Sequence, residues 1–289
     1  MKKEIKLCAY VVGLYVCFVS WGYLQEKITS TEYSSDHDAT IRLRFKFPFI
    51  LNFLMAISAS IVAAMAELIL RPIILNPIPF LAYMKPAATC ALASPIGYTA
   101  LEFINFPLMI LTKASKPVPV MLIGILFYNQ KYTLSKYLSV LLICGGIILF
   151  SAFKSKSESK ARNLLEELFG ISLIIVNLFL DGYTNNQQDF LFRKYQTPSE
   201  TMMKSVNFFQ AVYLGSYILL SRALFPASSE LTGFMTLLEH SSQVRFDILL
   251  FCIMASLGQL LIFSLMKDFG SLVWVTVNDL YCNPHSFFY

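Results

Sequence analysis

Long apolar runs follow one another along almost the whole chain, separated by short charged stretches. Most runs are close to 20 residues long, which is the length that an α-helix needs to cross a bilayer. They lack the alternation of an outer-membrane β-barrel. We therefore predict an all-α polytopic membrane protein with spans at Leu7–Leu24, Phe47–Leu70, Tyr83–Phe103, Phe106–Phe127, Tyr137–Phe153, Leu168–Phe190, Met203–Leu224 and Phe246–Met266, and a ninth that opens near Gly270.

The overall composition agrees with this class. Hydrophobic residues make up 56% of the chain and the mean hydropathy is +0.59, far above the value for a soluble domain. The chain starts with a basic segment, as a secretory signal does, but the apolar run is long and Ser20-Trp21-Gly22 is a poor cleavage site, so we expect an uncleaved helix. The six cysteines form no C-x-x-C motif or Cys/His cluster, so we expect no disulfide framework, metal or cofactor.

Two lysines lie in the middle of the fourth predicted span, Phe106–Phe127. Lys113 and Lys116 are roughly ten residues from either end, so their ammonium groups do not readily reach the membrane surface. Charge at that depth is costly and is kept where it faces a partner, a polar cavity or a substrate path. The two lysines are three residues apart and share a helix face, and Pro117 and Pro119 break the helical hydrogen bonds just beyond them. This pattern predicts an anion-binding site.

Each of these candidate groups also has a structural interpretation. Either lysine can instead pair with a buried carboxylate such as Asp181 or Glu67. Asp181, Gln188 and Asp189 lie on the polar second half of the sixth span, which either contributes to the site or is simply the aqueous end of that helix. The stretch 25–27 at the end of the first span is an interfacial cap in most membrane proteins.

The order of the spans indicates an internal repeat. We predict a first five-helix repeat over residues 1–153, a charged linker over 154–167 and a second repeat over 168–289. An odd number of helices per repeat gives the two repeats opposite membrane orientations, an inverted arrangement with which many transporters build a midplane site. Weak sequence symmetry agrees, because Phe106-Pro107-Leu108 can be aligned with Phe269-Gly270-Ser271-Leu272.

Four segments of the chain carry a family resemblance over roughly residues 7–277. They are Tyr23-Leu24-Gln25-Glu26-Lys27-Ile28, Lys113-Ala114-Ser115-Lys116-Pro117-Val118-Pro119-Val120-Met121, Leu180-Asp181-Gly182-Tyr183-Thr184 with Gln188-Asp189, and Ala255-Ser256-Leu257-Gly258-Gln259. In this order they resemble the nucleotide-sugar transporters of the drug/metabolite transporter superfamily, most closely the endoplasmic-reticulum branch called UDP-galactose transporter homologue.

The resemblance implies ten helices, five in each inverted repeat, with both termini in the cytoplasm. It also implies exchange of a nucleotide sugar, UDP-galactose first, or of ATP against ADP, across the endoplasmic reticulum membrane, with the Golgi membrane as the alternative. We expect the substrate-binding residues to be Lys113, Lys116, Asp181, Gln188 and Gln259. The resemblance raises Gln25, Glu26 and Lys27 to expected gate residues.

The end of the chain departs from the family pattern. Residues 278–289 match no part of it, and Asp279 and Pro284 fit poorly in a lipid-spanning helix. We therefore expect a C-terminal repeat that is incomplete here, with about eight full spans and part of a ninth, through a gene-model error or, less favoured, a natural short isoform. Transport is expected only from a version with about 25 or more further residues that complete the inverted repeat. Sequencing the transcript across the codons of Val277 and Asn278 tests this.

The expected mechanism is electrostatic recognition of a diphosphate, followed by rocking of the two repeats. The expected partners are the nucleotide sugar or nucleotide and membrane lipids, with a homodimer left open and no nucleic acid. Two alternatives from other classes remain. One is a membrane-embedded enzyme acting on phosphorylated ligands with Asp181 as base, although the sequence has no metal-binding cluster or nucleophile motif for it. The other is a non-transporting scaffold.

Overall fold

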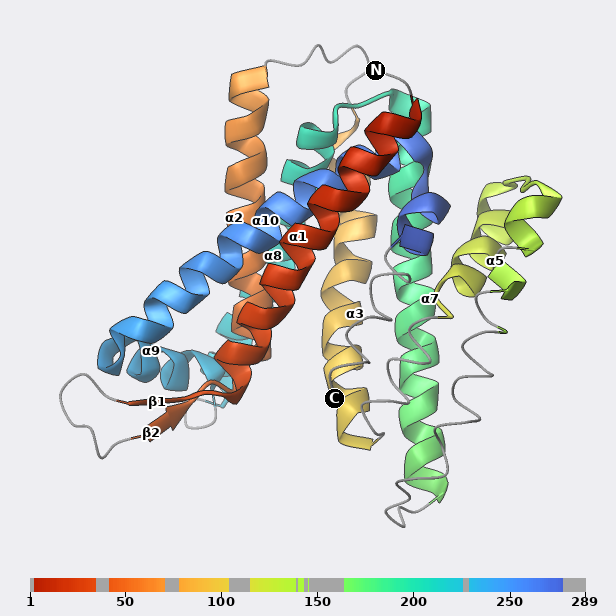
Figure 1. Cartoon of the computed structure of the whole chain (residues 1–289). Coiled ribbons are helices and arrows are strands. Elements are labelled where there is room, and N and C mark those ends of the chain that lie inside the picture. The colour runs from red at the N-terminus through yellow and green to blue at the C-terminus, as the bar shows by residue number, and fades with distance from the viewer. Residues whose placement is uncertain are drawn as a thin grey trace. The chain divides into compact units, whose positions relative to one another are not determined.

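The computed structural model describes residues 3–34, 42–70, 78–103, 115–138, 140–142, 145, 164–225 and 229–277 (Figure 1). These residues are mostly helical, as the apolar pattern predicts. The elements are α1 (Lys3–Ser30), β1 (Glu32–Ser34), β2 (Arg42–Arg44), α2 (Pro48–Leu70), the 3-10 helix η1 (Phe80–Tyr83), α3 (Met84–Phe103), α5 (Pro117–Tyr128), α7 (Leu164–Tyr195), α8 (Ser199–Leu224), α9 (Glu230–His240) and α10 (Ser242–Phe269). Residues 271–277 are also helical.

Four of the described helices are long and apolar enough to cross a membrane: Glu4–Thr29, Pro48–Leu70, Leu168–Tyr195 and Ser242–Phe269. They cover the predicted first, second, sixth and eighth spans, except for Phe47 at the start of the second. The described part of the chain therefore shows fewer apolar spans than the eight or nine that we predicted. The third and seventh predicted spans are helices, α3 and α8, but they contain more polar and charged residues than a purely apolar span does.

The fourth and fifth predicted spans are described only in part. In place of one helix over 106–127, the described residues give a turn at Ser115–Lys116 and then α5, which has 12 residues and begins at Pro117. Proline suits the first helical position, where its missing N–H costs nothing. Residues 104–114, and with them Lys113, lie outside the described residues, as does most of 137–153.

Contact clustering divides the chain into two compact units, each made of two separate stretches. The first unit is Met1–Ala88 with Tyr195–Leu265, and the second is Thr89–Lys194 with Met266–Tyr289. The inverted repeat stays a prediction. Of its predicted linker, residues 164–167 belong to α7 and residues 154–163 lie outside the described residues, as does the tail 278–289.

In the first unit, α2 packs along α8 (Figure 1). At one end, a β-hairpin and α9 complete an apolar cluster with the adjoining ends of α1, α2, α8 and α10. The strands are antiparallel, and Tyr33 faces Leu43 across the pair. The side chains of Tyr33 and Phe45 are almost fully buried in this cluster. Our sequence analysis missed both the hairpin and α9, although the alternation in Arg42-Leu43-Arg44-Phe45-Lys46-Phe47 is typical of a half-buried strand.

The second unit contains α3, α5 and α7. Ala100, Ile174 and Leu178 form a small core, and the Asn177 side chain donates a hydrogen bond to the Ala93 carbonyl of α3 at 2.6 Å. Gly182 lets α7 approach the backbone of α5 closely, because a Cβ atom there would lie 3.3 Å from the nitrogen of Val120. These contacts hold α7 against α3 and against the start of α5, where the candidate site lies.

Candidate functional site

The structure brings Lys116 together with Asp181. Lys116 precedes the first residue of α5, and its Nζ lies 2.9 Å from Oδ2 of Asp181 on α7. Their side chains are 17% and 32% exposed, so neither charge is sealed from water. Asp181 is one of the two structural partners that the sequence left open. The other, Glu67, forms an ion pair with Lys204 and accepts a hydrogen bond from Thr201 at 2.8 Å, in the first unit.

Small polar groups of α3 and α7 surround this ion pair. The hydroxyls of Thr89 and Thr184 lie 2.5 Å apart. The Cys90 thiol interacts with Thr184 and is close enough to Asp181 and Lys116 to sense both charges. Hydroxyl and thiol groups can rearrange around either a carboxylate or another anion, because a hydroxyl both donates and accepts. Among these groups, the Cys90 thiol is the α3 side chain that lies near the pair.

The first residues of α5, 117–120, provide no free backbone donors. Pro117 and Pro119 have no N–H, while the N–H groups of Val118 and Val120 donate to the carbonyls of Ser115 and Lys116 at 3.0 and 3.3 Å. Anion binding by helix N-terminal N–H groups is thus excluded for residues 117–120. Lys116 is therefore the cationic group that the described residues place at the start of α5.

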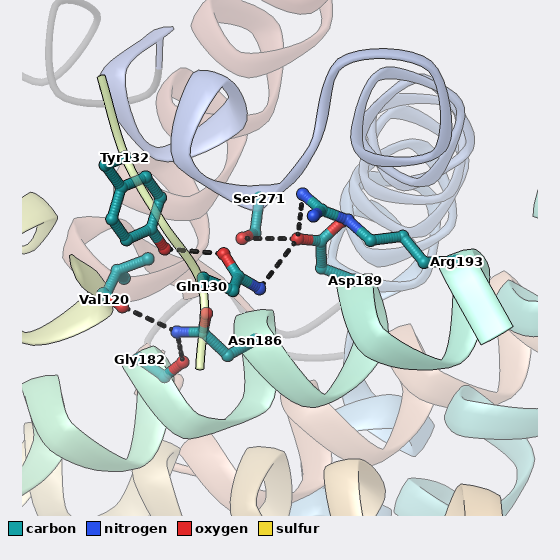
Figure 2. A network of polar contacts seen from close by, with 8 residues as sticks. All are labelled: Val120, Gln130, Tyr132, Gly182, Asn186, Asp189, Arg193 and Ser271. Carbon is teal, nitrogen blue, oxygen red and sulfur yellow. Dashed lines mark hydrogen bonds and ion pairs between the residues drawn. The ribbon is translucent and has the colours of Figure 1, made fainter. Parts of the chain in front are cut away.

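A second polar cluster lies near the carboxyl-terminal end of α7, around Asp189 (Figure 2). The Asp189 side chain is 2% exposed and pairs with Arg193, one helical turn later, at 2.9 Å. Gln130, just after α5, donates to Oδ2 of Asp189 at 3.3 Å, and Ser271 donates to the same oxygen at 3.5 Å. Tyr132 donates to the Gln130 side chain at 2.7 Å. We refer to Asp189, Arg193, Gln130, Tyr132 and Ser271 as the Asp189 network.

Burial is the main reason why the pKa of Tyr132 rises to about 12, and the neighbouring Asp189 carboxylate raises it further. The Tyr132 hydroxyl therefore stays protonated and keeps donating at physiological pH. Asn186 lies beside the network and donates to the carbonyls of Val120 and Gly182 at 2.8 and 2.9 Å (Figure 2). Its Oδ1 approaches Gly124, where any larger residue would collide with it and with the Tyr132 hydroxyl.

The remaining predicted site residues are less closely connected. Gln188 is buried on α7, and Gln259 is half-buried on α10. Of the expected gate residues, Gln25 is half-buried and Glu26 is exposed. Lys27 forms an ion pair with Asp247 at 2.7 Å. The roles of these residues stay predictions.

The hairpin of the first unit covers the carboxylate of the Lys27 pair, whereas the Lys27 side chain is 31% exposed. The Asp247 side chain is 3% exposed, and it also accepts a hydrogen bond from the Tyr33 hydroxyl at 3.1 Å. Burial and the Asp247 carboxylate raise the pKa of Tyr33 well above its ordinary value. These contacts join α1, the hairpin and α10, and they resemble the interfacial cap more than a movable gate.

Sequence reasoning missed several of these groups. Arg193 follows Asp189 by four residues, a spacing that favours an ion pair on a helix surface and could have revealed it. Gln130, Ser271 and Asp247 had no such signal, because their partners are far away in the sequence. Among the described residues, no group of three or more His, Cys, Asp or Glu side chains could hold a metal ion.

Comparison with known proteins gives consistent matches along the chain. Residues 6–280 match the UAA transporter family. The chain is 32% identical to UDP-galactose transporter homolog 1 of Debaryomyces hansenii, over 96% of this chain and 84% of that protein. It is 33% identical to solute carrier family 35 member B1 of Gallus gallus, over 93% and 79% of the two chains. One crystal structure shares the fold with a TM-score of 0.51 and 14% identity, covering 93% of this chain and 88% of that one.

Proposed function

The chain belongs to the UAA transporter family, and on this basis we propose that it exchanges a nucleotide sugar, or a nucleotide, across a membrane by alternating access. UDP-galactose is the first candidate, because a relative with 32% identity is named a UDP-galactose transporter homolog. Exchange of ATP against ADP is the second. The proposed location is the endoplasmic reticulum membrane, with the Golgi membrane as the alternative. The family assignment confirms a transporter rather than an enzyme, as the sequence predicted.

The Lys116–Asp181 ion pair is the observation that supports this proposal most directly. A nucleotide diphosphate carries two to three negative charges, so it competes with one carboxylate for the Lys116 ammonium group. Charge-assisted hydrogen bonds to phosphate oxygens are strong, and they are stronger in a low-dielectric site than in water. A third of the Asp181 side chain is exposed, so water can solvate its carboxylate when the substrate takes its place.

The charges at this site also favour exchange of one anion for another over net transport of a single substrate. Asp181 can neutralise Lys116 after the substrate leaves. Lys113 lies outside the described residues, and its charge in the middle of a predicted span needs a counter-charge of its own. A carrier whose site holds an uncompensated positive charge has a high free energy when it closes without an anion. We therefore expect the empty carrier to change orientation slowly, and a second anion to make the return step fast.

Ligand-dependent thermal stabilisation tests the binding part of the proposal. A ligand that binds only the folded protein raises its apparent stability by mass action. Three purified proteins are compared in detergent: the wild type, Lys116→Ala and Lys204→Ala. Each is screened with UDP-galactose, other nucleotide sugars, ATP and ADP. Lys204 is a matched control, because it is also paired with a carboxylate but lies in the first unit.

We expect at least one nucleotide or nucleotide sugar to stabilise the wild type and Lys204→Ala, and to have no effect on Lys116→Ala. Equal stabilisation of all three proteins would show that Lys116 does not bind the ligand. Stabilisation of none of them by any compound in the screen would argue against the substrate class.

A further inference from the structure

We propose that the Asp189 network is a gate that holds one end of the second unit closed and opens during transport (Figure 2). This inference rests on the proposed carrier function. The network joins three segments of the chain: α7, the residues after α5, and the residues after α10. A gate needs contacts that hold segments together in one state and separate in the other without a prohibitive cost.

Arg193 is the permanent part of the network. It lies on the same helix as Asp189, and its guanidinium group contacts both carboxylate oxygens, Nε with Oδ1 at 3.2 Å and the terminal nitrogen with Oδ2 at 2.9 Å. This pair does not depend on any other segment. Because 63% of the Arg193 side chain is exposed, its charge is solvated in either state. The buried carboxylate is thus neutralised whether or not the other segments remain in contact.

Gln130 and Ser271 are the separable part. Both donate to Oδ2 of Asp189, at 3.3 and 3.5 Å, which is long for hydrogen bonds to a carboxylate. Each comes from a different segment, and both groups can bond to water once they separate. Breaking them therefore costs little, because bonds of this length are weak and water can replace both donors' partner after separation. An apolar contact of the same size would oppose opening more strongly.

The position of the network along α7 also suits a gate. Asp189 follows Asp181 by eight residues, which is about 12 Å along the helix axis. It lies near the carboxyl-terminal end of α7, whereas the Lys116–Asp181 pair lies deeper in the helix. An anion that reaches Lys116 from this end passes the level of the network. The gate and the proposed binding site are therefore separate groups on one rigid helix.

A glycine beside Ser271 supplies a hinge. Gly270 separates the end of α10 from the helical residues 271–277 and has a φ of +90°, a conformation that other residues rarely adopt. A Cβ atom at this position would lie 3.4 Å from the Arg193 guanidinium group. The backbone of Gly270 thus sits against the ion pair, and a rotation about it moves Ser271 toward or away from Asp189.

Reversible cross-linking tests the gate. We introduce Gln130→Cys and Ser271→Cys together and join them with a short, thiol-cleavable cross-linker. The two single variants, treated in the same way, are matched controls for labelling of the native cysteines. Two measurements are made on each protein: counterflow of the labelled ligand in proteoliposomes, and ligand-dependent thermal stabilisation.

We expect cross-linking of the double variant to lower counterflow at least about tenfold, because the closed end can no longer open. Cleavage of the linker restores it, and both single variants remain active throughout. Unchanged counterflow in the cross-linked double variant, with an active wild type, would overturn the gate alone. Loss of ligand-dependent stabilisation and counterflow in the wild type itself would overturn the proposed function, and the gate with it.

Discussion

The ion pairs Lys27–Asp247 and Lys116–Asp181 are similar in length but differ in how the carboxylate is held. Asp247 in the first unit is 3% exposed and receives a second hydrogen bond from Tyr33. Asp181 in the second unit is 32% exposed. In the sequence, each pair is simply a lysine and a distant aspartate. The solvent exposure of the aspartate distinguishes the two pairs in the structure.

This difference in aspartate exposure indicates which of the two lysines is available to bind a ligand. Removing the partner of a buried carboxylate leaves an uncompensated charge in a low-dielectric site, so Lys27 is committed to Asp247. Water can solvate Asp181, so the proposed function has Lys116 leave it for an anionic substrate. The predictions below test this difference, in order of decreasing effect on the stability of the protein without ligand.

Lys27→Ala is expected to be the most damaging change. It leaves the buried Asp247 carboxylate with the Tyr33 hydroxyl but without its cation, which should destabilise the fold by about 3 to 5 kcal/mol. The measurement is thermal unfolding in detergent. The double variant Lys27→Ala with Asp247→Asn should recover much of the loss, because it removes the uncompensated charge. A Lys27→Ala protein as stable as the wild type would mean that the pair is not structural.

Arg193→Ala should cost somewhat less, about 3 kcal/mol, because the buried Asp189 carboxylate loses its cation but keeps two hydrogen bonds, from Gln130 and Ser271, where Asp247 keeps one. Gln130→Ala should cost only about 0.5 to 1.5 kcal/mol, since Arg193 still neutralises the carboxylate. Thermal unfolding of both variants side by side checks the ranking. If Gln130→Ala proves the more damaging of the two, the division into permanent and separable contacts is wrong.

Glu230, which lies outside the predicted spans, should make the stability of the fold depend on pH. Burial raises the pKa of this carboxyl above its ordinary value of 4.5, although the N–H groups of Ile50 and Phe49 partly oppose the shift. The folded state therefore holds this proton more tightly than the unfolded state, and the associated stability is present below pH 4.5 and lost as pH rises through the folded pKa.

In Glu230→Gln this contribution to the pH dependence should disappear, while the amide oxygen can still accept the Ile50 N–H. The expected difference from wild type at neutral pH is about 1 kcal/mol or less, in favour of the variant. Thermal unfolding between pH 4 and 7 measures it, because the stability of the wild type relative to the variant should fall as pH rises through the folded pKa of Glu230. A steeper fall in the variant would contradict the sign.

Lys116→Ala should change the stability of the ligand-free protein least, by about 1 kcal/mol or less, because Asp181 is partly solvated. It should nevertheless abolish the response to ligand. Lys116→Arg is expected to fail too, because a planar guanidinium group is bulkier than an ammonium group and directs its hydrogen bonds differently. Destabilisation as large as that of Lys27→Ala, with ligand affinity intact, would make Lys116 a structural residue.

The apolar pattern predicted much of the fold. Runs of about 20 apolar residues revealed α1, α2, α7 and α10, because helical length and hydrophobicity are local properties of the sequence. The hairpin and α9 were missed because each is short and is stabilised by packing against helices from distant parts of the chain, as the burial of Tyr33 and Phe234 shows.

The sequence predicted the charged residues of the candidate site but not how they pair. Lys116 and Asp181 were found because charge within an apolar run is conspicuous. The sequence could not choose between Asp181 and Glu67 as the partner of a lysine, since that choice depends on which helices pack together. Gln130 and Ser271 were not predicted either. A neutral polar residue near a helix end is common, and its partner depends on which helices pack together.

Counterflow in proteoliposomes tests the central claim most directly. The product of the sequenced transcript is reconstituted, and uptake of labelled UDP-galactose, or of the best ligand from the stability screen, is followed into vesicles with and without unlabelled ligand inside. We predict rapid uptake only into the loaded vesicles, and none by Lys116→Ala while Lys204→Ala remains active. Equally rapid uptake into empty vesicles would contradict exchange, undiminished counterflow by Lys116→Ala would contradict the site, and ligand binding without any flux would favour a scaffold over a carrier.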